Sequence, residues 1–220
     1  MAEVISNSKL NKIKVINEQK KIYFKYNNKK ISPWNNIPFY NSKKKCYNMI
    51  CEIPKWTRKK FELDTKLKFN PIIQDKINGK PREFIYGAMM WNYGFIPQTW
   101  ENPQNITKGY GGDNDPLDFI DIGEKKLKIG NIYPVKVLGS ICLIDSNEID
   151  WKIVGINEND DNFHNYNDIT DVPKYLLNGI REWFRWYKYK DNILNSYIYE
   201  EQFLDSKYSR NVIEECHEEW

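Results

Sequence analysis

The chain has 220 residues, of which 40% are hydrophobic and 15% aromatic. This composition predicts one well-cored globular domain and excludes a disordered chain. The net charge is only +3, but residues 1–50 carry eleven lysines against two glutamates, so the rest of the chain is acidic. An acidic body argues against a nucleic-acid-binding face, where a basic stripe would be expected.

The lack of targeting signals and the choice of reactive side chains exclude further classes of protein. The best apolar run, residues 137–144, is strand-sized and far short of the ~20 residues of a membrane span. The N-terminal stretch lacks the apolar core of a secretory signal, so we expect a cytoplasmic protein with no membrane partner. The only histidines are His164 and His217, and no two cysteines form a CxxC pair, which argues against zinc or a histidine cluster. Scattered thiols of this kind are expected to be reduced.

The first 18 residues are polar and aperiodic, which predicts a flexible basic arm over residues 1–18 and a single domain over 19–220. From Lys20 the pattern KKIYFKY alternates as a half-buried strand does. Further strand-like segments, separated by Pro, Gly, Asn and Asp, cover residues 47–53, 83–86, 131–144 and 151–156. Strands this short are typical of a small barrel or a sandwich.

Helical periodicity replaces the strand pattern late in the chain. Apolar side chains recur at helical spacing from Tyr175 to Tyr187, with Asp171 as a candidate N-cap and Pro173 in the first turn. A second helix is predicted over residues 206–219. Its inward face would be formed by Val212, Ile213 and Cys216.

The stretch 111–121 reads GGDNDPLDFID and carries Asp113, Asp115 and Asp118 within six residues. Carboxylates at this density repel one another unless cations or hydrogen-bond donors lie among them. Pro116 fixes one backbone torsion, and the two glycines allow an unusual backbone approach. Oxygen ligands of this kind suit Mg²⁺ or Mn²⁺ rather than zinc.

Two other interpretations of this stretch compete with a metal site. A solvated acidic turn would account for a lone Asp-x-Asp. Asp113 and Glu124 also have the first-to-twelfth spacing of an EF-hand, but Leu117 occupies its fifth position and Asp118 its obligatory glycine. The EF-hand is therefore disfavoured, whereas the acidic turn stays open on this stretch alone.

A second acidic group, DSNEIDWK, covers residues 145–152 between two apolar strands. A plain hairpin turn would explain it equally well. However, Lys152 follows Asp150 closely. A metal-binding carboxylate beside a phosphate-binding ammonium is the pairing that hydrolysis of a polyanion requires.

With these motifs the chain resembles family I soluble inorganic pyrophosphatases, particularly the eukaryotic type. Their signature Asp-x-Asp-Pro-hydrophobic-Asp stands here as DNDPLD over residues 113–118. Further blocks match in the same order across roughly residues 20–218: EIPKWT from Glu52, NPIIQD from Asn70, NYG from Asn92, PQTWE from Pro97, DWK from Asp150 and EWFR from Glu182. The other class of soluble inorganic pyrophosphatases relies on a histidine-rich motif. A chain with only two histidines does not contain that motif.

The resemblance implies an α+β fold, mainly β with flanking helices, built on a small, closed, OB-like five-stranded barrel. It implies Mg²⁺-dependent hydrolysis of pyrophosphate to two orthophosphates at the barrel mouth. Asp115 would be the general base. The metal ligands would be Asp113, Asp118, Asp145, Asp150 and Glu62, with Glu52 and Asp75 as outer acidic residues. The two phosphates would be held by Lys60, Arg82, Tyr93, Lys152, Tyr187 and Lys188.

Elementary chemistry agrees with this division of roles. Cationic side chains clamp the highly charged pyrophosphate while metals neutralise developing oxyanions. Two metals ~3.5–4 Å apart can share one water and lower its pKa from 15.7 toward ~7, so an aspartate suffices as the base. Mn²⁺ is expected to substitute for Mg²⁺, and Ca²⁺ to inhibit, because Ca²⁺ prefers more ligands and longer bonds. Taken singly, each cation would also fit a solvated surface position.

Two expectations and one rival interpretation remain. Met89 stands where the family usually has a tyrosine, so either Tyr86 supplies that phenol or the contact is absent. Eukaryotic members form a dimer in which the Trp56 region takes part, so a homodimer is one expectation.

The rival to the pyrophosphatase interpretation is a non-enzymatic OB-like module that binds nucleic acid through aromatic residues and the basic N-terminal arm. The acidic body argues against it, because the aspartates would repel a nucleic-acid strand.

Overall fold

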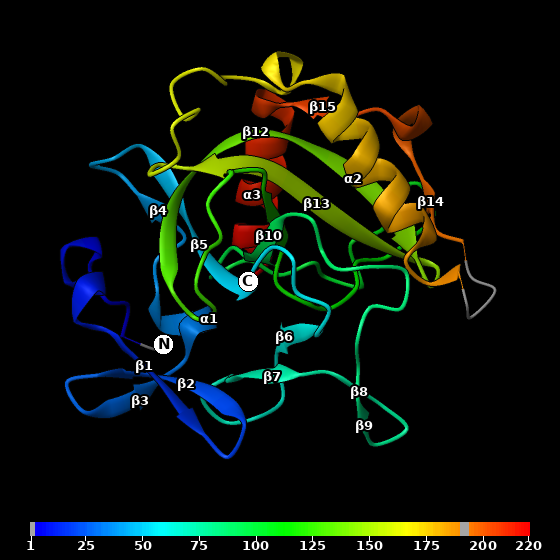
Figure 1. Cartoon of the computed structure of the whole chain (residues 1–220). Helices are drawn as coiled ribbons and strands as arrows, with labels where there is room; N and C mark the ends of the chain where they lie inside the picture. Colours follow the sequence, from blue (N-terminus) through cyan, green and yellow to red (C-terminus); the bar gives the residue numbers. More distant parts are fainter. Residues whose placement is uncertain (1–2, 190–193) are drawn as a thin grey trace.

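The computed structural model describes residues 3–189 and 194–220, and its centre is a ring of five paired strands (Figure 1). The ring consists of β12 (Ile132–Asp145), β13 (Glu148–Asn157), β11 (Asp118–Asp121), β10 (Asn92–Phe95) and β5 (Cys46–Ile53). The long strand β12 pairs with β13 and also, at its start, with β5, and this second pairing closes the ring. Strands β11 and β13 run parallel, and the other neighbours run antiparallel. The fold is mainly β with few helices, as the sequence predicts.

Gly94 explains how β10 fits against β5. A Cβ at Gly94 would lie 1.9 Å from the Ile50 carbonyl oxygen, so a side chain there would push the two strands apart. The register between β10 and β5 shifts at the same point, between Tyr93 and Gly94. An irregularity of this kind bends a strand, which helps a short sheet to close on itself.

Shorter strands extend this framework. β4 (Tyr40–Asn41) pairs with β5, while β14 (Ser196–Tyr197) and β15 (Leu204–Asp205) pair with β12. A second sheet lies below the ring in Figure 1. It contains β1 (Lys14–Glu18), β2 (Lys21–Tyr26), β3 (Lys29–Ile31), β7 (Ile72–Gln74) and β6 (Phe61–Leu63). The hairpin of β8 (Lys76–Ile77) and β9 (Lys80–Pro81) projects beside it.

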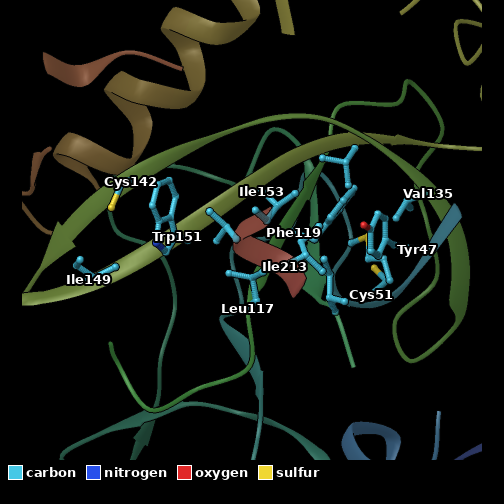
Figure 2. Packing of buried hydrophobic residues seen from close by; sticks show 14 of the residues in the cluster. Tyr47, Cys51, Leu117, Phe119, Val135, Cys142, Ile149, Trp151, Ile153 and Ile213 are labelled. Carbon is cyan, nitrogen blue, oxygen red and sulfur yellow. The ribbon is translucent and has the colours of Figure 1, made fainter. Parts of the chain in front are cut away.

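Both faces of the central strands are buried. Trp151 and Ile153 of β13 belong to an apolar cluster that includes α3 (Ser206–Glu219), part of which Figure 2 shows. Val154, the next residue, faces a second cluster that includes α2 (Lys174–Trp186). Because both faces are covered, these strands read as nearly continuous apolar runs, which is why the sequence pattern locates them well. A third cluster, with Ile22, Phe24, Ile50, Leu63, Ile72 and Phe95, joins the ring to the second sheet.

The helices follow the sequence prediction closely. The predicted helix over 206–219 is α3, and the predicted helix after residue 170 is α2. The predicted N-cap of α2 is wrong: Pro173 holds that position, and Asp171 instead closes a capping box in η2 (Ile169–Asp171). The described part of the chain also contains η1 (Asn7–Lys12), α1 (Pro33–Asn36) and η4 (Tyr199–Glu201). Over the described ranges, 3–189 and 194–220, none of the helices is both long and apolar enough to cross a membrane.

The N-terminal region differs from the predicted arm. Residues 14–18 form β1, which pairs along its whole length with β2. Ile5 is buried, and its N–H donates to the Asn36 carbonyl at 2.8 Å. Long-range pairing to a neighbouring strand overrides the polar local composition here, as it often does for β-structure. Met1 and Ala2 lie outside the described residues.

The predicted strands at 47–53, 131–144 and 151–156 are confirmed as β5, β12 and β13, and KKIYFKY is β2. The predicted strand at 83–86 is wrong. There only Glu83 pairs, in an isolated bridge with Lys59. Phe84 is buried but Tyr86 is 44% exposed, so the apolar run is a loop with one anchored side chain rather than a strand.

Candidate active site

One cavity of about 230 Å³ gathers the residues that the sequence nominates. All of them line it except Asp75, although they are spread from Glu52 to Lys188 along the chain. Asp75 contacts the cavity residues Lys60 and Arg82 instead. The ring, the second sheet and the end of α2 each contribute side chains, so the cavity exists only in the folded chain.

The aspartate loop (residues 111–118) is held in place by the strap (residues 98–102). The N–H of Asn114 donates to the Glu101 carbonyl at 2.9 Å. A Cβ on Gly112 would lie 2.4 Å from that same carbonyl oxygen, so glycine is what lets the two segments approach this closely. Asn114 has φ of 71°, a left-handed conformation that asparagine tolerates better than most residues. The turn chemistry of the loop thus fixes where its carboxylates point.

Three carboxylates meet behind this loop: Glu101, Asp113 and Asp150 each offer an oxygen, and the three oxygens lie within 4.8 Å of one another. Burial, followed by the charge of a neighbouring carboxylate, raises the pKa of Glu101 and of Asp113 well above the ordinary range. Burial likewise raises the pKa of Asp150, to about 7, although Lys152 opposes the rise. A cluster of three buried carboxylates costs free energy unless a cation lies among them.

The donor set fits Mg²⁺. Glu101 Oε1 accepts the N–H of Trp151 at 2.9 Å, but Glu101 Oε2 is buried and has no hydrogen-bond partner among the described residues. A buried, unpartnered carboxylate oxygen beside two further carboxylates is a natural ligand position for a hard divalent cation. The carboxylates of the aspartate loop and of β13 are therefore able to hold such an ion between them.

Strand pairing places Asp118 beside Lys152. Parallel pairing of β11 with β13 sets these two residues opposite each other. The Lys152 ammonium contacts the carboxylates of Asp118 and Asp150 and lies 2.9 Å from the Tyr93 hydroxyl, which also donates to Asp118. Burial disfavours the charge on Lys152, but Asp118 and Asp150 outweigh it and raise the pKa of the ammonium well above its usual value. Lys152 is therefore a buried, permanent cation.

A second cationic group forms where α2 ends. The Tyr187 hydroxyl donates to Asp145 Oδ2 at 2.6 Å, and the Lys188 ammonium contacts Oδ1 of the same carboxylate. Burial opposes ionisation of Asp145, yet these two donors outweigh it and lower the pKa of Asp145 below its ordinary value. Asp145 lies at the end of β12, so the hairpin to β13 carries a charged carboxylate into the cavity.

A third group stands on the β6 side. The Lys60 ammonium contacts Glu62 Oε2 and lies 3.4 Å from Asp75 Oδ2, and Arg82 Nη1 donates to that Asp75 oxygen at 2.9 Å. Glu52 is buried and its Oε1 accepts the N–H of Leu63 at 2.6 Å, which ties β6 to β5. Glu52 and Asp75 thus hold the elements that carry the cavity residues.

Asp115 is placed differently from its neighbours. It lines the cavity, and its backbone N–H donates to Asp113 Oδ1 at 2.9 Å. Desolvation in the cavity, followed by the charge of Asp118, raises the pKa of Asp115 to about 6. A carboxylate with a pKa near neutrality is suited to accept a proton.

Known proteins are similar to this chain in sequence and in fold. A family model described as inorganic pyrophosphatase matches residues 49–220. The chain belongs to the inorganic pyrophosphatase family. It is 43% identical to the inorganic pyrophosphatase of Bos taurus over 201 residues, which is 86% of this chain and 69% of the bovine protein. It is also 43% identical to inorganic pyrophosphatase 1 of Caenorhabditis elegans over 211 residues, 91% of this chain. The chain spans about half the length of that nematode relative, 49%.

Solved structures of family members are equally similar. One is the N-terminally truncated vacuolar soluble pyrophosphatase of Trypanosoma cruzi in complex with PPi. It has a TM-score of 0.88 at 40% identity and covers 94% of this chain and 89% of that chain. Another is the type I inorganic pyrophosphatase of Toxoplasma gondii, with a TM-score of 0.88 at 36% identity, covering 94% of this chain and 97% of that chain.

Sequence reasoning missed Glu101 as a candidate ligand of this pyrophosphatase-family site. The residue lies within the matching block PQTWE, and that block was the only signal for it. Nothing in the local pattern distinguishes Glu101 from a surface glutamate, because its 3% exposure arises from packing against the loop and β13.

The residue expected at the family tyrosine position, Met89, carries a buried thioether. Met89 is 1% exposed and lines the cavity, and its backbone pairs with Thr57 through the Met89 N–H at 3.0 Å. The proposed substitute, Tyr86, is not among the residues lining the cavity. Its ring packs edge-on against Trp183 and Tyr189. The structure therefore does not support Tyr86 as the source of a replacement phenol.

Proposed function

We propose that the chain hydrolyses inorganic pyrophosphate to two orthophosphates in an Mg²⁺-dependent reaction. The observation that carries this proposal is that Asp113 and Asp150 of the carboxylate cluster line the same small cavity as the side chains able to hold phosphates. Pyrophosphate needs both, because its charge must be neutralised before a nucleophile can approach. The relative from Trypanosoma cruzi that was solved with PPi lends support.

The phosphate-binding side chains are already positioned by carboxylates. Lys60, Lys152 and Lys188 each contact a carboxylate in the cavity. These ion pairs hold the ammonium groups at the cavity wall, and the oxygens of pyrophosphate would become their new partners. Arg82, Tyr93 and Tyr187 would complete the grip on the two phosphates.

The acidic residues divide into ligands, a base and supports. Asp113, Asp118, Asp145, Asp150 and Glu62 would hold the cations, together with Glu101. Bound Mg²⁺ would supply neutralisation of the phosphate oxygens and a lowered pKa of the attacking water. Asp115 would accept the proton of that water, which its pKa of about 6 favours. Mn²⁺ would substitute, whereas Ca²⁺ would inhibit because its longer bonds misplace the reactants.

Three finer features belong to the same proposal. The five-stranded ring would be a closed OB-like barrel with the cavity at its mouth.

The four cysteines are free thiols, which supports a reducing, cytoplasmic location. Trp56 is 62% exposed, which supports a homodimer that covers it. Comparing the sedimentation of the wild type with that of Trp56→Glu tests the dimer. If the two chains sediment with the same mass, the result would contradict it.

Phosphate release from pyrophosphate is the test of the function. We expect release with Mg²⁺, almost none in excess chelator, and a strong loss for Asp150→Asn. Asp161→Asn is the matched control, since the Asp161 side chain is 87% exposed and, among the described residues, pairs only with Lys125. A purified, folded chain that releases no phosphate with Mg²⁺ or Mn²⁺ would overturn the proposal. Binding of single-stranded nucleic acid by that chain would then favour the binding-module interpretation.

A further inference from the structure

The C-terminal turn of α3 is bonded to the strap. The Cys216 carbonyl lies in the last turn of α3, which ends at Glu219. The Trp100 N–H donates to that carbonyl at 2.8 Å. His217 Nδ1 lies 2.6 Å from the Gln98 carbonyl oxygen, and because a carbonyl can only accept, Nδ1 is the donor. Two bonds therefore join the end of α3 to the strap.

Gln98 depends on these bonds because its backbone is strained. Its φ is 55°, in the left-handed region that costs a non-glycine residue free energy. The N–H of Gln98 donates to the Trp34 carbonyl at 2.9 Å, and its carbonyl accepts from His217. Gln98 is 5% exposed, so loss of the His217 donor would leave a buried carbonyl without this partner. The strained turn would then relax more easily.

The strap in turn positions both acidic segments of the cavity. Its backbone exchanges three bonds with the aspartate loop: from Glu101 N–H to the Asp115 carbonyl at 3.0 Å, from Asn114 N–H to the Glu101 carbonyl at 2.9 Å, and from Gly112 N–H to the Asn102 carbonyl at 3.2 Å. Trp100 Nε1 donates to Asn114 Oδ1 at 3.0 Å. The Glu101 side chain accepts the N–H of Trp151, next to Asp150 on β13. A shift of the strap would therefore move the loop and β13 relative to each other.

We propose that His217 is a positioning residue for the carboxylate cluster of Glu101, Asp113 and Asp150. It holds the strap in its strained conformation, and the strap sets the spacing between the aspartate loop and β13. The inference rests on the proposed metal site. It predicts a selective effect: loss of the His217 donor weakens Mg²⁺ binding, while the basic side chains that hold pyrophosphate stay in place.

The His217 ring also has a packing role, which the test must separate from donation. Its centroid lies 3.7 Å from that of Phe39 and 6.0 Å from that of Trp220, and both rings are stacked on it. His217→Phe keeps a ring in this stack but removes the donor. His217→Asn loses the ring but places an amide N–H close to the position of Nδ1. The two variants therefore remove one role each.

The experiment measures Mg²⁺ binding by calorimetry, thermal unfolding, and hydrolysis as a function of Mg²⁺ and of pyrophosphate. For His217→Phe we expect the Mg²⁺ Kd to rise about tenfold, the lower end of what outer partners of metal ligands contribute. Its Tm should fall by only a few degrees, because one buried carbonyl loses its partner while the ring stack is kept. Its KM for pyrophosphate at saturating Mg²⁺ should stay near the wild-type value. His217→Asn should lower Tm and restore the Mg²⁺ affinity. His164→Phe, at an exposed histidine, is the control.

The outcomes separate this inference from the proposed function. A wild-type chain that neither binds Mg²⁺ nor releases phosphate would overturn the proposed function itself. A competent wild type with an unchanged Mg²⁺ affinity in His217→Phe would overturn the inference alone. The inference would equally fail if both His217 variants weakened Mg²⁺ binding in proportion to their loss of Tm, because His217 would then be a packing residue only.

Discussion

Asp75 and Arg82 form an ion pair in which Asp75 Oδ2 lies 2.9 Å from Arg82 Nη1, with both side chains 18% exposed. The same carboxylate oxygen lies 3.4 Å from Lys60 Nζ. The backbone repeats the connection, since Asp75 N–H donates to the Lys60 carbonyl and Arg82 N–H donates to the Asp75 carbonyl. Asp75 therefore joins two phosphate-binding candidates without lining the cavity itself.

Asp75→Asn should raise the KM for pyrophosphate by about tenfold, because Arg82 and Lys60 lose the charge that orients them. The Mg²⁺ dependence should change little, since Asp75 is not one of the proposed ligands. Initial rates over a matrix of Mg²⁺ and pyrophosphate concentrations separate the two effects. Asp161→Asn, which breaks an exposed ion pair, is the control. A Mg²⁺ defect with normal KM would show that Asp75 serves the cations instead.

Asp115→Asn and Asp118→Asn should fail in different ways. General-base assistance is typically worth ~10²–10⁴-fold, so Asp115→Asn should lose turnover in that range and keep most of its metal affinity. Asp118→Asn should lose metal affinity, and it also removes the charge that Lys152 contacts. Calorimetry of Mg²⁺ binding beside turnover distinguishes them. If Asp115→Asn bound Mg²⁺ as weakly as Asp118→Asn, the assignment of base and ligand would have to be abandoned.

Removal of divalent cations should abolish turnover and leave the fold intact. The three apolar clusters that form the core lie outside the carboxylate cluster, so circular dichroism should hardly change. Added Mg²⁺ should raise Tm, because a cation bound only by the native state stabilises it by about 2.7 kcal/mol at a hundredfold excess over Kd. Ca²⁺ should also raise Tm but should not support turnover. Full activity in excess chelator would contradict the metal mechanism.

Deletion of residues 1–18 should lower Tm and leave turnover per folded molecule within about tenfold. None of the described residues in this segment, 3–18, lines the cavity, but β1 pairs with β2 and Ile5 is buried. The structure thus indicates a stability role for the N-terminal region, for which the sequence predicts only a flexible basic arm without catalytic residues. Deletion of residues 1–4, which spares Ile5 and β1, is the control. A larger loss of turnover at a temperature where the deleted chain is folded would assign the region a catalytic or assembly role.

Asp168 should make stability depend on acidity. Its Oδ2 accepts the N–H of Ser206 at 3.0 Å and its side chain caps η2. Burial opposes ionisation, but the Ser206 donors outweigh it and lower the pKa of Asp168. A carboxylate with a lowered native pKa contributes stability that is present above its unfolded pKa of ~3.9 and is lost as pH falls through the lower native value. Asp168→Ala should therefore cost ~1 kcal/mol at pH 7.

That difference between wild type and Asp168→Ala should shrink as pH falls below the unfolded pKa of ~3.9 and through the lowered native pKa, because the wild-type carboxyl then becomes protonated. Urea unfolding of both chains at several pH values measures it. Asp161→Ala serves as the comparison, because an exposed ion pair contributes little at any pH. A difference that stays constant from pH 7 to pH 2.5 would show that the Asp168 contribution is packing rather than charge.

Local sequence patterns predicted the elements whose character is set by residues close together in the sequence. The aspartate loop is recognisable because ligand type, glycine and proline all lie within a few residues. Helix α3 has the predicted bounds, since an N-capping Asp205 and apolar residues at helical spacing define it without reference to the rest of the chain. Strands β5, β12 and β13 are buried on both faces and therefore stand out as apolar runs.

By itself, then, the sequence determined the family, the main helices and strands, and most of the polar side chains that line the cavity. Only the tertiary structure decided which of them touch. The role of Glu101 depends on burial against a loop and a strand that lie elsewhere in the chain, and Lys152 reaches Asp118 only because β11 and β13 pair in parallel. The pairing of β1 with β2 likewise overrides a polar sequence. Contacts of this kind join residues far apart in sequence, and their free energy resides in burial and geometry that no local pattern records.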